Sequence, residues 1–248
     1  MLAGVTFDVD GVLVDSPHEL AWRQTLERLM ANEWRDARAA SSYAPDRFTT
    51  AVYQAQVAGK PRLDGARAAL DFFHVPDAPT RAATYADRKQ RALVGLIEAG
   101  EFTAYPDALR FVAAVQALGF RLAVASSSKN ANAFLRAVQL GGRPLLDAFD
   151  VNLCGREFAH GKPDPEIFVT AGVELGLEPS QILVVEDAPA GVQAAKRAHM
   201  PAIGVARHAD ADGLRREGAE LVVPTLDAVD VAALAKGRLE RQDASSRG

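Results

Sequence analysis

The chain has 248 residues, of which 48% are hydrophobic and 24% charged, and its formal net charge is −4 at pH 7. These values are ordinary for a globular protein, and the acidic balance argues against binding to nucleic acid or to an anionic membrane surface. The single cysteine, Cys154, excludes an intramolecular disulfide. Because the sequence also shows neither a secretion signal nor an apolar run of about 20 residues, we expect a cytoplasmic protein without a membrane span.

Short apolar runs predict a parallel sheet. They are apolar on both faces, as in strands that helices cover on both sides, and they occupy residues 2–9, 120–126, 182–187, 202–206 and 220–224, with a shorter run at 149–155. Helical patterns lie between them, at residues 106–119, 165–176 and 190–200. This alternation predicts an α/β, Rossmann-like core with right-handed crossovers.

A block of about eighty residues interrupts this alternation after the first strand. It is nearly strand-free and predicts helices at residues 17–34, 45–59, 66–73 and 78–100. Two crossings, near residues 14–16 and 100–103, would join the block to the core and form a hinge. The predicted domains are therefore an α/β core (1–16 and 101–235), an inserted helical domain (17–100) and a polar C-terminal tail (236–248) whose last part frays.

Polar residues follow several of the predicted strands. They are Asp8 and Asp10 after the first strand, Ser126 to Asn130 after the second, and Glu186 and Asp187 later, with Lys162 ahead of a helix. Each segment alone fits a turn or a helix cap. The carboxyl ends of parallel strands share one edge of a sheet, however, so we expect these groups to meet there. Four acids would repel one another, and Mg²⁺ is the usual remedy in a phosphate site.

Four segments in this order, "DVDGVLVDS", "VASSSKN", "GKPDPEIF" and "VVEDAPAGVQAAKRA", resemble the motifs of the haloacid dehalogenase superfamily of phosphotransferases. The resemblance implies that family's fold, with the helical block as a mobile cap. It implies that Asp8 is the nucleophile and Asp10 the general acid and base. Ser126 and Lys162 would hold the phosphoryl oxygens, and Mg²⁺ would be held by Asp8, the backbone of Asp10, Glu186 and Asp187.

Further segments resemble the β-phosphoglucomutases within this superfamily. "AGKPRLDG" is similar to their G-x-x-R-x-x-S cap loop, with Gly65 in place of the serine, while "SSSKN" is similar to "SASKN" and "HELAW" to H-x-x-A-W. The resemblance implies a sugar-phosphate site formed by Gly59, Lys60, Arg62, Ser127, Ser128, Lys129 and Asn130, with His18 and Lys89. The alternatives are a solvated Arg62, a His18 that merely lies near a helix start, and a Lys89 on an exposed charged face.

The resemblance implies an Mg²⁺-dependent mutase. Such an enzyme interconverts β-glucose 1-phosphate and glucose 6-phosphate through an aspartyl-phosphate and a bisphosphate. The alternative is an Mg²⁺-dependent phosphatase of small phosphate esters, and a non-catalytic binding protein is a third hypothesis, which the complete set of catalytic positions disfavours. We expect a small phosphosugar as the partner. The sequence is compatible with a monomer but does not determine the oligomeric state.

Overall fold

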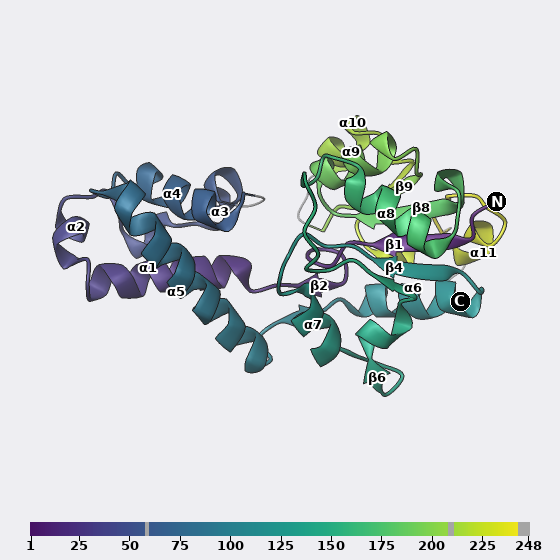
Figure 1. The fold of residues 1–248 in the computed structure, drawn as a ribbon, viewed down its shortest axis with the longest axis horizontal. Coiled ribbons are helices and arrows are strands. Elements are labelled where there is room, and N and C mark those ends of the chain that lie inside the picture. Colours follow the sequence, from purple (N-terminus) through teal and green to yellow (C-terminus); the bar gives the residue numbers. More distant parts are fainter. Residues whose placement is uncertain (58–59, 208–210, 243–248) are drawn as a thin grey trace. The chain divides into compact units, whose positions relative to one another are not determined.

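The computed structural model of this chain describes residues 1–57, 60–207 and 211–242. The chain divides into two compact units (Figure 1), which we call the sheet unit (Met1–Ser16 and Thr103–Gly248) and the helical unit (Pro17–Phe102). Each unit has a hydrophobic core of its own.

A six-stranded parallel sheet forms the centre of the sheet unit, with the strand order β10-β9-β8-β1-β4-β7. The strands are β1 (Gly4–Phe7), β4 (Arg121–Val124), β7 (Val151–Asn152), β8 (Ile182–Glu186), β9 (Ala202–Val205) and β10 (Leu221–Val223). Each lies within a run predicted from the sequence. Because β1 is central and Phe7 is in register with Val124 and Val185, the residues that follow β1 lie beside the ends of β4 and β8.

Helices cover both faces of this sheet. They are α6 (Pro106–Ala117), α7 (Ala131–Ala137), α8 (Glu166–Leu175), α9 (Pro189–Arg197), α10 (Ala211–Arg216) and α11 (Val231–Leu234), with 3₁₀ turns at Leu145–Ala148, Pro179–Gln181 and Leu226–Ala228. Figure 1 shows α8, α9 and α10 on one side of the sheet and α6 on the other. Phe168 and Val192 pack against the strands on the first side. On the second, Phe111 meets Phe7 edge to face at 6.0 Å.

Two short antiparallel pairs complete the sheet unit, and the sequence patterns did not predict either. They join β2 (Val14–Asp15) to β3 (Thr103–Ala104), and β5 (Gln139–Leu140) to β6 (Arg143–Pro144). The first pair lies where the chain leaves the sheet unit and returns to it. The two crossings are therefore held together by backbone hydrogen bonds.

The helical unit contains α1 (His18–Ala31), α2 (Arg35–Ala39), α3 (Thr50–Gln56), α4 (Arg62–Phe72) and α5 (Ala78–Glu98), with a 3₁₀ turn at Pro45–Arg47. The single helix predicted over residues 45–59 is wrong. Phe48 is buried after the 3₁₀ turn, and Thr49 is extended and accepts a hydrogen bond from the Val52 amide at 3.3 Å. This N-cap starts α3 as a separate helix.

The start of the predicted C-terminal tail is packed against the sheet unit. The Asp230 amide donates to the Glu240 carbonyl, and the Gln242 amide to the Ala228 carbonyl, both at 2.9 Å. Arg241 also pairs with Val229 in an antiparallel bridge. The last residues, 243–248, lie outside the described part of the chain.

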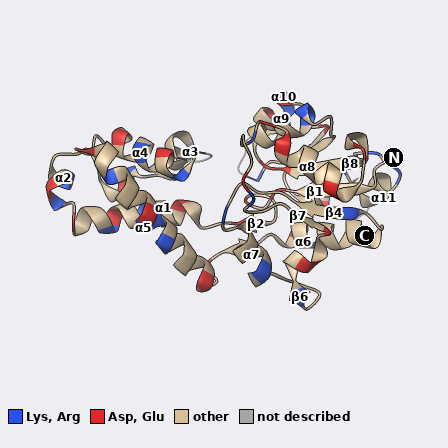
Figure 2. Cartoon of the chain, viewed as in Figure 1, with Lys and Arg blue, Asp and Glu red and all other residues tan. Residues whose placement is uncertain are grey.

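Within the described residues, every helix is too short or too polar to cross a membrane. Figure 2 shows acidic and basic residues interspersed over both units rather than gathered by sign.

Candidate functional site

The sharp turn after β1 carries the two aspartates. Asp8 follows the last residue of β1 and is 7% exposed, and its amide donates to the Val185 carbonyl of β8 at 3.0 Å. Gly11 has a φ of +79°, and a Cβ there would overlap with the Asp187 carboxylate. Glycine is required at this position because it permits both the left-handed backbone and the close approach of Asp187.

Lys162 links two of the acids. Its Nζ donates to Asp8 Oδ1 at 2.5 Å and forms an ion pair with Glu186 Oε1. The ammonium also lies 5.1 Å from the centre of the Phe168 ring. Burial by itself would lower the pKa of Lys162, but the charges of Asp8 and Glu186 outweigh it and raise that pKa above its ordinary value. Lys162 is therefore a permanent cation between two carboxylates.

Three carboxylates converge beside this lysine. Oxygens of Asp8, Glu186 and Asp187 lie within 4.8 Å of one another. Burial raises the pKa of all three groups, and the neighbouring acids raise the pKa of Asp187 further. One ammonium does not offset this negative charge, and hard divalent cations such as Mg²⁺ prefer oxygen donors. The donor set therefore fits a divalent cation, with the Asp10 side chain outside the group of three.

A second glycine makes room for this cluster. Gly191 lies in the first turn of α9, and a Cβ there would overlap with the Glu186 carboxylate. Glu186 is thereby packed against the start of α9 with only 1% of its surface exposed. The sequence predicted the acids but not the need for glycine at this position.

The hydroxyl segment after β4 folds on itself. Ser126 is buried, and its Oγ accepts from the Ser128 amide at 3.1 Å, while Ser128 Oγ accepts from the Asn130 amide at 3.3 Å. Ser127 and Lys129 are exposed, and Lys129 forms a 3.4 Å ion pair with Glu157. An ion pair between two exposed groups is weak, so Lys129 can exchange it for another anion.

The remaining predicted residues lie in the helical unit. Lys89 is buried, donates to His18 Nδ1 at 2.9 Å and lies 5.0 Å from the Trp22 ring centre. The alternative that placed Lys89 on an exposed face is therefore wrong, because α5 turns this residue toward α1. Arg62 is exposed at the start of α4, and Lys60 is exposed just before it. Gly59 lies outside the described residues.

The protonation of His18 follows from this contact. Burial, and then the charge of Lys89, lower the pKa of His18 to about 3. The imidazole is therefore neutral near pH 7. Because Nδ1 accepts from Lys89, the proton is on Nε2, and this buried atom has no hydrogen-bond partner among the described residues. His18 can therefore donate a hydrogen bond from Nε2 to a ligand.

The contacts of Arg207 in the sheet unit could not be predicted from any sequence pattern. Arg207 follows β9 and donates to the Gly11 and Val12 carbonyls at 2.9 and 3.0 Å and to Asp107 at 3.1 Å. Sequence reasoning missed Arg207 and Asp107 because they come from segments far from the motifs.

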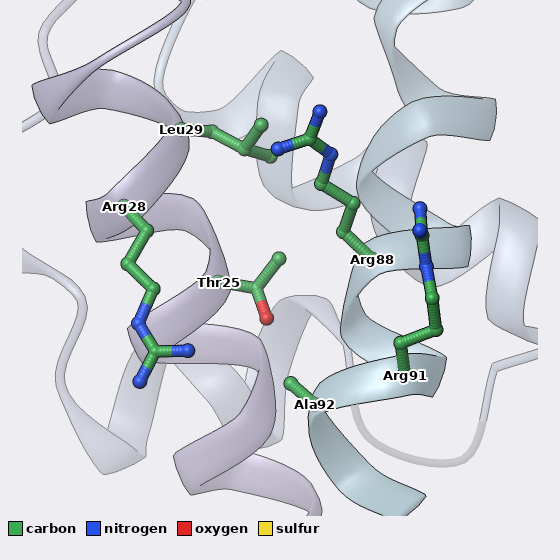
Figure 3. A pocket seen from close by; sticks show the side chains of 6 residues that line it. All are labelled: Thr25, Arg28, Leu29, Arg88, Arg91 and Ala92. Carbon is green, nitrogen blue, oxygen red and sulfur yellow. The ribbon is translucent and has the colours of Figure 1, made fainter. Parts of the chain in front are cut away.

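A pocket of about 390 Å³ lies in the helical unit between α1 and α5 (Figure 3). It is lined by Thr25, Arg28, Leu29, Arg88, Arg91 and Ala92. None of these is a predicted site residue, and Arg88 is already held by both oxygens of Glu33. All six lining residues belong to the helical unit, whereas the acidic cluster belongs to the sheet unit.

Several known enzymes have sequences similar to that of this chain. The sequence profile of the haloacid dehalogenase-like hydrolases matches residues 2–199. A beta-phosphoglucomutase from Mycobacterium tuberculosis is 34% identical over 236 residues, which cover 89% of this chain and 88% of the relative. A validoxylamine A 7'-phosphate phosphatase from Streptomyces hygroscopicus subsp. limoneus is 30% identical over 210 residues, covering 84% and 87%.

The fold has solved counterparts as well. The crystal structure of a beta-phosphoglucomutase from Pyrococcus sp. strain ST 04 has a TM-score of 0.73 and 28% sequence identity, and the match covers 96% of this chain and 99% of the other. The family profile, the similar sequences and the solved structure thus agree with the family that the four motifs resemble. The chain is an enzyme that belongs to the haloacid dehalogenase-like hydrolase family.

Proposed function

We propose that the chain is a phosphosugar mutase that interconverts β-glucose 1-phosphate and glucose 6-phosphate by way of an aspartyl-phosphate and a bisphosphate intermediate. The observation that carries the phosphoryl-transfer part is the buried Asp8 carboxylate at the end of β1, with Lys162 Nζ 2.5 Å from its Oδ1. The mutase part is supported by relatives such as the Mycobacterium enzyme and by the cations and donors of the helical unit and of the segment after β4.

Each half of the reaction uses the two aspartates in turn. An oxygen of Asp8 attacks the phosphorus on C1 of β-glucose 1,6-bisphosphate, the bond between this phosphorus and the ester oxygen breaks, and Asp10 gives its proton to the leaving oxygen of glucose 6-phosphate. In the second half the 6-hydroxyl of β-glucose 1-phosphate attacks the aspartyl-phosphate, Asp10 takes the hydroxyl proton, Asp8 is released as a carboxylate, and the bisphosphate is formed again. The charges and protons balance over the cycle.

Charge on the transferring phosphoryl group needs donors. Ser126 Oγ and the Lys162 ammonium lie at the edge of the sheet beside Asp8, and they would stabilise the phosphoryl oxygens. Asp8, Asp187 and the Asp10 carbonyl would hold Mg²⁺, with Glu186 beside them. When bound, this ion offsets the negative charge of the acids and of the phosphoryl oxygens.

A mutase must also bind a second, non-reacting phosphate. We assign this role to Arg62, whose planar guanidinium suits phosphate, together with Ser127, Ser128, Lys129 and Asn130, with Gly59 and Lys60 in the same loop as Arg62. His18, held by Lys89, would donate its Nε2 proton when sugar phosphate is bound. Such a contact would couple substrate binding to the exclusion of water.

One observation favours the phosphatase alternative. Gly65 replaces the serine of the mutase-like loop, and it is buried against Val57, where a Cβ would lie 3.3 Å from Val57 Cγ1. The hydroxyl of the mutase-like loop is therefore absent at this position. A phosphatase is also among the relatives.

The deciding experiment supplies β-glucose 1-phosphate, Mg²⁺ and a trace of β-glucose 1,6-bisphosphate. A mutase forms glucose 6-phosphate without a matching release of phosphate. Steady phosphate release without isomer would reject the mutase and leave the phosphatase. The Asp8→Asn variant should be inactive in both assays, and turnover by this variant would reject the whole scheme.

Arg62→Ala tests the distal phosphate site. We expect mutase turnover to fall by about 100-fold, because a charge-assisted bidentate contact is lost, while hydrolysis of p-nitrophenyl phosphate is retained. Arg67→Ala is the matched control, since Arg67 is an exposed arginine of the same helix. Equal losses in both assays for Arg62→Ala would contradict the assigned role.

A further inference from the structure

The side chain of Arg207 is buried against the turn that carries Asp10. Only 9% of it is exposed, and its Nε and Nη2 donate to the carbonyls of Gly11 and Val12, at 2.9 and 3.0 Å. The third nitrogen, Nη1, donates to Asp107 Oδ2 at 3.1 Å. All three nitrogens of the guanidinium are therefore in use, which is the arrangement for which arginine, and not lysine, is suited.

The two carbonyls depend on this side chain. The turn is closed by its own backbone bonds from the Gly11 amide to the Val14 carbonyl at 2.8 Å and from the Leu13 amide to the Val9 carbonyl at 2.9 Å. The carbonyls of Gly11 and Val12 have no part in those bonds and face Arg207 instead. Buried carbonyls without a donor cost free energy, so loss of the guanidinium would favour a different turn conformation.

Arg207 is itself held from two sides. Asp107, in the first turn of α6, also accepts from Thr225 Oγ1 at 2.6 Å and from the Leu226 amide at 2.7 Å. Burial would raise the pKa of Asp107, but these hydrogen bonds and Arg207 lower it below its ordinary value. The Tyr105 ring stacks on the guanidinium, with 3.6 Å from the ring centre to Cζ. The arginine is thus fixed before it meets the turn.

The same contacts reach both crossings of the chain. Gly11 and Val12 precede β2, Tyr105 follows β3, and the Tyr105 amide donates to the Leu13 carbonyl at 3.0 Å. Arg207 therefore joins the inner ends of both crossings to the end of β9.

We propose that Arg207 is a positioning residue that holds the Asp10 turn in the geometry for proton transfer. It does so by donating hydrogen bonds to the Gly11 and Val12 carbonyls from its place after β9. The proposal rests on the proposed phosphoryl-transfer function, in which Asp10 is the acid. It adds to that function a residue outside the four motifs.

The test compares two phosphate esters with enzyme in excess, so that only the first transfer is measured. p-Nitrophenolate leaves phosphorus without a proton, whereas the sugar oxygen of glucose 6-phosphate needs one from Asp10. For Arg207→Met we expect transfer from glucose 6-phosphate to fall by about 10- to 100-fold, the usual effect of a small misplacement. Release of p-nitrophenolate should change by less than about threefold. Equal losses, or no loss, would overturn the proposal.

Two further measurements separate positioning from folding. Guanidinium chloride at millimolar concentration should restore transfer from glucose 6-phosphate in Arg207→Met, while potassium chloride at the same ionic strength should not. Failure of this rescue in a folded variant would also overturn the proposal. Arg110→Met is the matched control, because Arg110 is an exposed arginine of the same unit, paired with Asp227, and it should behave as wild type.

Failure of the proposed function would look different. In that case the wild-type protein itself would transfer phosphate from neither ester. If Arg207→Met does not fold, as judged by circular dichroism, Arg207→Lys carries the same comparison. The three acceptors lie at three different nitrogens of the guanidinium, and the one nitrogen of an ammonium cannot reach all of them. The same selective loss is therefore expected, and its absence would overturn the proposal.

Discussion

Asp8, Glu186 and Asp187 place three carboxylates against the single ammonium of Lys162. Two glycines, Gly11 and Gly191, let these carboxylates approach the backbone closely. A divalent cation held by these oxygens would offset the negative charge that the single ammonium leaves. At the scale of single residues, the site therefore depends on glycine at these two positions as well as on the acids.

Gly11→Ala should disturb the acidic cluster more than it disturbs the fold. The added Cβ would meet the Asp187 carboxylate, whereas in Gly119→Ala, at the same φ of +79°, it meets open space. Both variants should lose about 1–2 kcal/mol of unfolding free energy from left-handed strain. Only Gly11→Ala should also need more Mg²⁺ for half-maximal activity, measured by metal titration. Equal Mg²⁺ requirements would contradict the prediction.

His18 predicts a pH dependence of stability. Its pKa is about 3 in the folded chain and 6.5 ordinarily, so between these values the unfolded chain binds a proton that the folded chain does not. Stability is therefore lost as the pH falls below about 6.5, by about 2 kcal/mol at pH 5.

The measurement is the melting temperature between pH 7 and pH 5. His18→Asn should lose less stability over this interval than wild type. His74→Asn, at an exposed histidine of the same unit, is measured alongside as the control. An unchanged pH dependence in His18→Asn would show that other groups cause it.

At the scale of elements, the contact of α1 with α5 organises the helical unit. The rings of Trp22 and Tyr85 meet edge to face at 4.9 Å, and Tyr85 is fully buried. The Tyr85 hydroxyl donates to the Trp22 carbonyl at 2.8 Å. Lys89, one turn later on α5, extends the same contact to His18. Figure 2 shows that α5 carries charges of both signs, yet this one lysine is buried.

Tyr85→Phe tests this contact. It removes one buried hydrogen bond without creating a cavity, so we expect a loss of about 1 kcal/mol of unfolding free energy. Hydrogen exchange should increase in α1 and α5 and stay unchanged in the sheet unit. Tyr43→Phe is the control, because no hydrogen bond of the Tyr43 hydroxyl is found among the described residues. Similar losses in both variants would contradict the assignment.

At the scale of the whole molecule, the chain builds two separate cores. Among the described residues, β2 and β3 are the only strands that pair at the crossings. Asp15 of β2 is in register with Thr103 of β3. The ends of the inserted unit thus leave the sheet unit side by side. An insertion with adjacent ends disturbs its host fold little.

Replacement of residues 16–102 by Asn-Gly should therefore leave a folded sheet unit. These two residues form the tight turn that an antiparallel pair such as β2 and β3 requires. We expect native-like circular dichroism and residual hydrolysis of p-nitrophenyl phosphate, with mutase turnover lost because Arg62 and His18 are gone. Mutase activity in this variant would contradict the role proposed for the helical unit.

Local patterns were enough to predict the sheet and its acidic edge. β1, β4 and β8 are continuous apolar runs, and a parallel strand ends at the same edge as its neighbours, so Asp8, Glu186 and Asp187 are expected to meet at that edge. The split of residues 45–59 was not predicted, because Phe48 turns inward only when the other helices provide a core for it.

The sequence by itself determined the α/β class, the inserted helical block and the acids at the strand ends, because periodicity and strand order are local properties. The tertiary structure alone decided which charged side chains are buried. Lys89 is buried because α5 packs on α1, and Arg207 meets Gly11 across 196 positions of the chain. The partners of these two cations come from distant segments, so no local pattern contains them, and folding brings them together.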